Sequence, residues 1–119
     1  MNDSVVNTYG RPLVSVIIPY FQRNRGVLAA CVKSILVQKG DFDLSVVITD
    51  DSSPISAEED LAQQGGLDPR IKIVRQANAG AGAARNKSLD SVCVESDYIA
   101  LMDSDDQWME GFLDHAVKA

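Results

Sequence analysis

The chain has 119 residues, a mass of 12.9 kDa and a formal net charge of −6, which suit a single acidic domain with its own core. With a pI near 4.5 it lacks the basic surface of nucleic-acid binders, so we expect no nucleic-acid partner. No stretch approaches the roughly 20 apolar residues of a membrane span, and residues 1–11 lack the order of a signal peptide. We expect a cytoplasmic protein, and a membrane anchor is left open only for a longer parent chain.

Strand-like and helix-like stretches alternate along the first half of the chain. Residues 12–19 form a β-branched run closed by proline, which predicts a buried strand. Apolar positions at helical spacing from Val27 predict a helix, with Gly40 at its C-cap. Residues 44–49 predict the second strand, which is bounded by turn and capping residues.

The same alternation continues through the second half. Ser56 and Glu59 have the spacing of a capping box, which predicts a short helix to about Gln64. The elements expected after it are a strand, a helix, a strand and a last helix, at residues 70–75, 79–94, 97–102 and 109–118. Strands that alternate with helices in this way predict an α/β fold, with a mainly parallel open sheet and helices on both faces.

Clusters of aromatic or acidic residues follow three of the predicted strands. They are Pro19-Tyr20-Phe21, Asp50-Asp51 and Asp103-Ser104-Asp105. In parallel α/β sheets, ligands bind beyond the carboxyl ends of the strands, which is where these clusters belong. We therefore expect the three clusters to meet in one crevice.

Three carboxylates lie within four residues directly after the last predicted strand, at Asp103, Asp105 and Asp106. Like charges this close raise one another's pKa, and a hard divalent cation would relieve their repulsion. A calcium loop does not fit, because Trp108 occupies the position where the sharp turn needs glycine. Two interpretations stay open at this point: a metal site, or a solvated loop in which Asp106 caps the final helix.

The other clusters also allow two interpretations each. Asp51 either forms a turn or accepts a hydrogen bond from a base or a ribose. Tyr20 and Phe21 either pack in the core or stack on a base. The run from Gly80 to Arg85 lacks the third glycine of a dinucleotide fingerprint, but it opens a helix whose N–H groups are exposed. Arg85 then serves either an anion or a structural salt bridge.

The remaining reactive side chains have simpler expectations. Cys31 and Cys93 fall within helical apolar patterns, so we expect buried free thiols rather than a disulfide. His115 is the only histidine and is expected at the surface. No Ser-His-Asp arrangement can be assembled around it, so nucleophilic catalysis of that kind is not expected.

Four segments in order, at residues 14–21, 46–53, 78–86 and 101–106, resemble the family 2 glycosyltransferases. The resemblance covers residues 13 to about 113. It implies the Rossmann-like, nucleotide-binding half of the A-type glycosyltransferase fold, a nucleotide-sugar donor, and Mn²⁺ or Mg²⁺ as cofactor.

By this resemblance, Pro19, Tyr20 and Phe21 line the base and ribose pocket, and Asp51 accepts the N3–H of a uracil-like base. The donor would then be a UDP-sugar. The family often has Thr-Tyr-Asn where this chain has residues 20–22, and a glycine in the second motif where Ser52 stands.

The acidic segment matches the Asp-x-Asp motif of the family. The resemblance makes Asp105 the direct metal ligand and places Asp103 near the metal or the ribose, with Ser104 between them in the donor site. Gly80 belongs to the same donor site through its backbone, and Arg85 would steady the nucleotide or the acidic motif.

Family members continue with an acceptor-binding half that supplies the general base of inverting transfer. We therefore expect residues 1–11 to be a tail and 12–119 to be the nucleotide-sugar-binding domain of a longer glycosyltransferase. It would transfer sugar to a hydroxyl acceptor in polysaccharide synthesis, and no catalytic base is assigned within it. Truncation would expose apolar surface and favour self-association. The alternative is a non-catalytic nucleotide-binding or assembly module.

Overall fold

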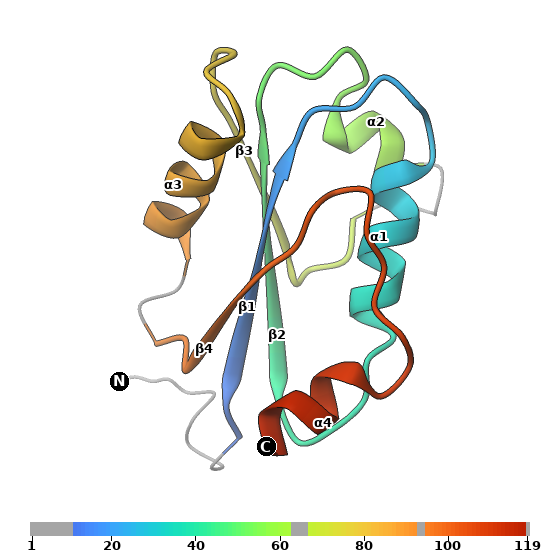
Figure 1. Cartoon of the computed structure of the whole chain (residues 1–119), viewed down its shortest axis with the longest axis vertical. Helices are drawn as coiled ribbons and strands as arrows, with labels where there is room; N and C mark the ends of the chain where they lie inside the picture. Colours follow the sequence, from blue (N-terminus) through green and yellow to red (C-terminus); the bar gives the residue numbers. More distant parts are fainter. Residues whose placement is uncertain (1–10, 63–66, 93–94, 119) are drawn as a thin grey trace.

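The computed structural model describes residues 11–62, 67–92 and 95–118 (Figure 1). The strands of this part of the chain form one parallel sheet in the order β3-β2-β1-β4. They are β1 (Leu13–Tyr20), β2 (Asp43–Asp50), β3 (Ile71–Arg75) and β4 (Tyr98–Leu101). The helices are α1 (Val27–Leu36), α2 (Ala57–Ala62), α3 (Ala81–Ser91) and α4 (Phe112–Lys118). The predicted α/β fold with a parallel sheet is confirmed.

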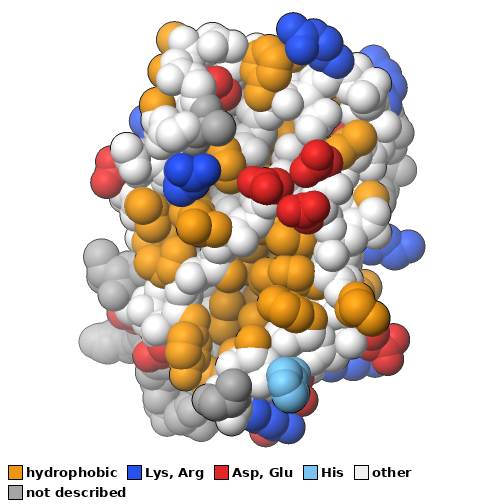
Figure 2. Space-filling view, in the orientation of Figure 1, with side chains coloured by type: hydrophobic (Ala, Val, Ile, Leu, Met, Phe, Trp, Pro, Cys, Tyr) orange, Lys and Arg blue, Asp and Glu red, His pale blue; other side chains and the backbone are white. Residues whose placement is uncertain are grey.

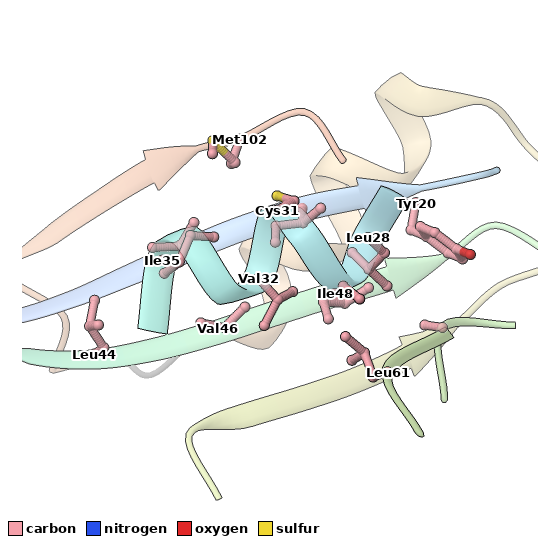
Figure 3. Close-up of a cluster of buried hydrophobic side chains, with 14 of the residues drawn as sticks. Tyr20, Leu28, Cys31, Val32, Ile35, Leu44, Val46, Ile48, Leu61 and Met102 are labelled. Atoms are coloured by element: carbon pink, nitrogen blue, oxygen red, sulfur yellow. The ribbon is translucent and has the colours of Figure 1, made fainter. Parts of the chain in front are cut away.

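Helices cover both faces of the sheet, as predicted, because alternate residues of its central strands point to opposite sides. On one face, Val16 of β1 and Val46 of β2 belong to a buried cluster with α1, α2 and α4, part of which Figure 3 shows. On the other face, α3 packs against β1 and β2, opposite α1 and α2 in Figure 1. There the buried hydroxyls of Thr49 and Ser88 share a hydrogen bond of 2.5 Å.

The end of α1 differs from the prediction. The helix ends at Leu36 with Val37 as its C-cap, so the prediction of Gly40 at that position is wrong. Beyond Val37, the buried Gln38 side chain donates to the Met109 carbonyl before α4 and accepts the Leu113 N–H in the first turn of α4. Gly40 is needed for a different reason, since a side chain there would collide with the ring of Phe42.

The start of α2 is capped locally, whereas the start of α3 depends on a tertiary contact. Ser56 Oγ accepts a hydrogen bond from the Glu59 N–H at 3.1 Å, as the capping box predicts, and α2 follows. α3 begins at Ala81, two residues later than predicted, because the N–H groups of Ala79 and Gly80 donate to the carboxylate of Asp51. The predicted ends of these two helices, at Gln64 and Val94, lie outside the described residues.

The register of the sheet brings the carboxyl ends of its strands to one edge. β1 pairs its last residue, Tyr20, with Asp50 at the end of β2, and β3 pairs Arg75 with the same Asp50. β4 ends slightly short of β1, and the Met102 N–H still donates to the carbonyl of Ile17 at 3.0 Å. The segments that follow the strands therefore start side by side.

A buried carboxylate from α2 caps α1. The N-cap of α1 is Gly26, which has a left-handed φ of +85° and no side chain to accept the first N–H groups. Asp60 supplies both acceptors: one oxygen bonds the Gly26 N–H at 2.5 Å and the other bonds the Ala29 N–H at 3.0 Å. Asp60 is fully buried, and its charge lies at the positive end of the helix dipole.

The expectations for isolated side chains are met where the structure describes them. Cys31 is a buried free thiol, and burial, together with the nearby carboxylates, raises its pKa to about 12. Cys93 lies outside the described residues. His115 is exposed, as predicted. No helix within the described ranges has both the length and the apolar character that crossing a bilayer requires.

We expect Asp60→Ala to lower the free energy of unfolding by about 1–3 kcal/mol, because it leaves buried N–H groups of α1 without an acceptor. The neighbouring Glu59→Ala is the matched control, since Glu59 is exposed and loses only an ion pair with Arg25, worth about 0–1 kcal/mol. Urea denaturation followed by circular dichroism measures both variants. Equal losses would contradict the capping role of Asp60.

Candidate functional site

Two hollows lie at the carboxyl edge of the sheet, and they share Pro19 and Asp103. The first, which we call the β1 hollow, has a volume of about 300 Å³. Its lining is Pro19, Tyr20, Phe21, Gln22, Asp51, Ala84, Asp103, Ser104 and Asp105. The second, the β4 hollow, has a volume of about 470 Å³. Its lining is Pro19, Arg85, Leu101, Met102, Asp103, Asp106, Gln107 and Trp108.

The acidic cluster consists of Asp103, Asp105 and Asp106. One oxygen from each carboxylate lies within 4.8 Å of the others, and all three side chains are exposed. Figure 2 shows acidic side chains gathered above a broad area of apolar surface. A turn closed by the Asp106 N–H and the Asp103 carbonyl, at 3.0 Å, brings the outer two together. Three adjacent carboxylates fit a hard divalent cation, and no described basic side chain forms an ion pair with them.

For Asp106 the sequence left two interpretations open, membership of the acidic cluster or a cap for the final helix. The capping interpretation is wrong, because α4 begins only at Phe112. The spacing of the cluster could have indicated its position, since the first and fourth residues of a β-turn lie close together. Asp106 therefore stands beside the Asp-x-Asp pair.

Asp51 is buried and faces the β1 hollow, with both of its oxygens bonded. One oxygen accepts hydrogen bonds from the Gln76 side-chain amide and the Ala79 N–H, each at 2.8 Å. The other accepts the Gly80 N–H at 3.0 Å. The Gln76 amide above all, and then these backbone groups, hold the pKa of Asp51 below its usual value. Asp51 thus fastens the loop between β3 and α3 to the end of β2.

Asp50, the residue before it, holds the turn after β2. Its buried carboxylate accepts the N–H groups of Ser53 and Ala57 at 2.8 and 2.9 Å, and the Arg75 guanidinium at 2.8 Å. Ser52, which directly follows Asp51, has a left-handed φ of +59°, a backbone conformation that favours glycine. Of the two neighbouring carboxylates, Asp50 therefore holds the turn and Asp51 faces the β1 hollow.

The two aromatic residues at the end of β1, Tyr20 and Phe21, have different surroundings. Tyr20 is buried and its hydroxyl donates to the Ile55 carbonyl at 2.7 Å, and burial raises its pKa. Phe21 is 36% exposed, with the Arg23 guanidinium 5.3 Å from its ring centroid. Gln22, which sequence reasoning did not assign, bonds Ser104 Oγ at 3.3 Å and so joins β1 to the acidic segment.

Gly80 and Arg85 lie in different surroundings. The Gly80 N–H is bonded to Asp51, as described above, so this part of the α3 start already has an acceptor. Arg85 is exposed and lines the β4 hollow. Within the described ranges it forms no hydrogen bond or ion pair, so its salt-bridge alternative is not realised there. It is a cation beside an acidic cluster in a protein of net charge −6.

We expect Asp51→Asn to lower the free energy of unfolding at pH 7 by about 1–3 kcal/mol, because an amide cannot accept all three hydrogen bonds. Since folding lowers the pKa of Asp51, its contribution is full above the unfolded value, about 3.9, and is lost as the pH falls through the lower folded value. The difference between wild type and Asp51→Asn should therefore shrink below about pH 4. Urea titrations from pH 7 to 3 measure it, with the exposed Asp90→Asn as control. A difference that does not change with pH would contradict this account.

Comparison with known proteins adds independent findings. Residues 15–119 match the family model described as Glycosyl transferase family 2. The succinoglycan biosynthesis protein ExoW of Rhizobium meliloti is 38% identical over 107 residues, which are 89% of this chain and 32% of that protein. Bacillus subtilis TuaG, provisionally assigned as a teichuronic acid biosynthesis glycosyltransferase, is 36% identical over 108 residues, 90% of this chain and 41% of that protein.

A solved structure supports the fold. The crystal structure of residues 1–349 of Staphylococcus aureus TarS matches with a TM-score of 0.71 and 24% identity, over 88% of this chain and 31% of that one. The chain thus spans about a third of the length of these relatives. Because the family model covers nearly the whole chain, and the fold and the relatives agree with it, the chain belongs to glycosyl transferase family 2.

Proposed function

We propose that this chain is the donor-binding part of a metal-dependent glycosyltransferase that moves a sugar from a UDP-sugar to a hydroxyl acceptor, with inversion. The observation that carries the proposal is the meeting of Asp51, Phe21 and the acidic cluster around the β1 hollow. A nucleoside diphosphate needs these same three features: a surface for the base, an acceptor for its N–H, and carboxylates for a metal that neutralises its phosphates. The synthesis of polysaccharides is supported by the names of relatives such as ExoW.

The nucleoside would lie in the β1 hollow. Phe21 offers an exposed aromatic ring for stacking, while Pro19 and the buried Tyr20 form the adjoining wall. The Asp51 carboxylate is ionised and already positioned by its three protein donors, and a carboxylate has room for a further one. That capacity suits the N3–H of uracil, which cytosine lacks.

The acidic cluster would hold Mn²⁺ or Mg²⁺ through Asp105 and Asp103, with Asp106 within reach of the same ion. When bound, such an ion takes up the charge of the departing nucleoside diphosphate. Ser104, through its hydrogen bond with Gln22, would hold the acidic segment beside the donor. The Gly80 N–H would help to position Asp51, to which it donates. Arg85 supplies the local positive charge that an anionic donor needs beside an acidic protein.

Inverting transfer also needs a base that removes the proton of the acceptor hydroxyl. We assign that base to none of the described residues, so the complete reaction is proposed for the longer parent protein. The competing proposal is a nucleotide-binding or assembly module without transfer activity. A parent protein that binds UDP-sugars but neither transfers nor hydrolyses them would favour that alternative.

We expect the chain to bind UDP at least about tenfold more tightly with Mn²⁺ than with a chelator, because an ion held by these carboxylates would offset the negative charge of the diphosphate. Asp105→Ala should abolish the difference, whereas Asp90→Ala, which removes an exposed carboxylate of α3, should keep it. Calorimetry measures both. Metal-independent binding by the wild type, or no binding by a folded chain, would contradict the site.

We also propose a second copy of this chain as a partner for the exposed edge of β4. Among the described strands, β4 has a neighbour on one side only, so its other side presents main-chain N–H and carbonyl groups. Its side chains Ile99 and Leu101 are 48% and 60% exposed. Main-chain groups beside apolar surface match the same edge of another copy, which can pair around a two-fold axis.

We expect the mean mass measured by light scattering to rise with protein concentration. Ile99→Lys should return the chain to a monomer, because a charge on an edge strand opposes pairing. Leu89→Lys, at an exposed apolar position of α3, is the control and should leave association unchanged. A monomer at every concentration would contradict the proposal, and an equal effect of both variants would replace strand pairing with non-specific contact.

A further inference from the structure

We propose that Gln22 is a positioning residue that fixes the spacing of the acidic cluster and thereby sets the affinity of this cluster for a divalent cation. The inference rests on the proposed function, because it concerns how firmly the metal ligands of that site are held. Gln22 follows β1, whereas the acidic segment follows β4, so the two meet only in the folded chain. There Gln22 lines the β1 hollow together with Asp103, Ser104 and Asp105.

The backbone of Gln22 is clamped by one hydroxyl group. Ser53 Oγ accepts the Gln22 N–H at 2.8 Å and donates to the Gln22 carbonyl, also at 2.8 Å. The Ser53 N–H in turn donates to the buried carboxylate of Asp50 at 2.8 Å. Gln22 is therefore fixed to the end of β2, and its side chain starts from a defined point.

The side-chain amide of Gln22 reaches from this point to the acidic segment. Its Nε2 donates to Ser104 Oγ at 3.3 Å, and Ser104 is buried between the exposed Asp103 and Asp105. One residue before Ser104, the Asp103 carbonyl accepts a hydrogen bond from the Cys31 thiol of α1 at 3.6 Å. The segment that carries the acids is thus anchored to the loop after β1 as well as to α1.

This anchoring matters because the carboxylates of the acidic cluster repel one another. One oxygen of each lies within 4.8 Å of the others, and a segment without anchors would relieve the repulsion by spreading. A cation would then have to gather the carboxylates again, at a cost that an anchored segment avoids. Hydrogen bonds that orient metal ligands raise the affinity for the metal in this way.

The test measures the binding of Mn²⁺ alone, without nucleotide, through the relaxation enhancement of water protons. Gln22→Met keeps the length of the side chain and removes its hydrogen-bond donor, so we expect it to weaken Mn²⁺ binding by about fivefold. Ser53→Ala should also weaken binding, although Ser53 lines neither hollow, because it releases the backbone of Gln22. Asn24→Leu is the matched control, since it removes an exposed amide from the same loop, and it should leave the affinity unchanged.

A double-mutant cycle with Ser104→Ala separates positioning from direct ligation of the ion. If Gln22 acts through Ser104, Gln22→Met should have no further effect in the Ser104→Ala chain. An undiminished loss in that background would make Gln22 a direct ligand and would overturn the inference. An unchanged affinity of Gln22→Met, or an equal loss in Asn24→Leu, would also overturn it.

Two further outcomes are kept apart from these. Circular dichroism measures whether each variant folds, and if Gln22→Met does not fold, the same cycle and control are applied to Ser53→Ala. If the folded wild-type chain binds no Mn²⁺, the metal site of the proposed function fails and the inference fails with it. If the wild type binds Mn²⁺ and the variants bind it equally well, only the inference is overturned.

Discussion

The carboxylates of Asp50 and Asp51 are the contacts on which the site depends, because they tie two loops and the last residue of β3 to the end of β2. Asp50 satisfies N–H groups of the segment before α2 and pairs with Arg75 of β3. Asp51 accepts hydrogen bonds from the Gln76 side chain and two N–H groups of the segment before α3. Buried acids are unfavourable unless hydrogen bonds compensate them, so each loop conformation and each charge stabilises the other. The hydrogen bonds that compensate these buried charges therefore also fix the conformation of the loops beside the hollows.

The acidic segment after β4 uses a different device. From Met102 to Asp105 the residues alternate between buried and exposed, so the two acids of the Asp-x-Asp pair project outward together. Met102 enters the core, and Ser104 is buried beside Gln22. The repulsion among the exposed carboxylates is therefore not relieved within the described protein, and the proposed cation would relieve it. Burial of Met102 and Ser104 on one side of the segment thus holds like charges close together on the other.

Much of the fold was predictable because it rests on local patterns. β1 and β2 are rich in β-branched residues, a composition typical of strands that are buried on both faces. The start of α1 at Val27 was predicted, but its C-terminal end, the acceptor that caps its start, and the start of α3 were not. Gly26 offers no cap of its own and depends on Asp60 from another helix, while Gly80 depends on Asp51. Such acceptors lie tens of residues away in sequence, and local capping rules do not detect them.

For the site, sequence alone determined which residue types gather at the strand ends, because parallel strands must deliver their carboxyl ends to one edge. The same pattern, and the family resemblance, indicated Asp103 and Asp105. Only the tertiary structure separated Asp50 from Asp51 and added Asp106 and Trp108 to the hollows. The physical reason is that the role of a carboxylate depends on which donors surround it. Those donors come from distant loops that meet only when the chain is packed.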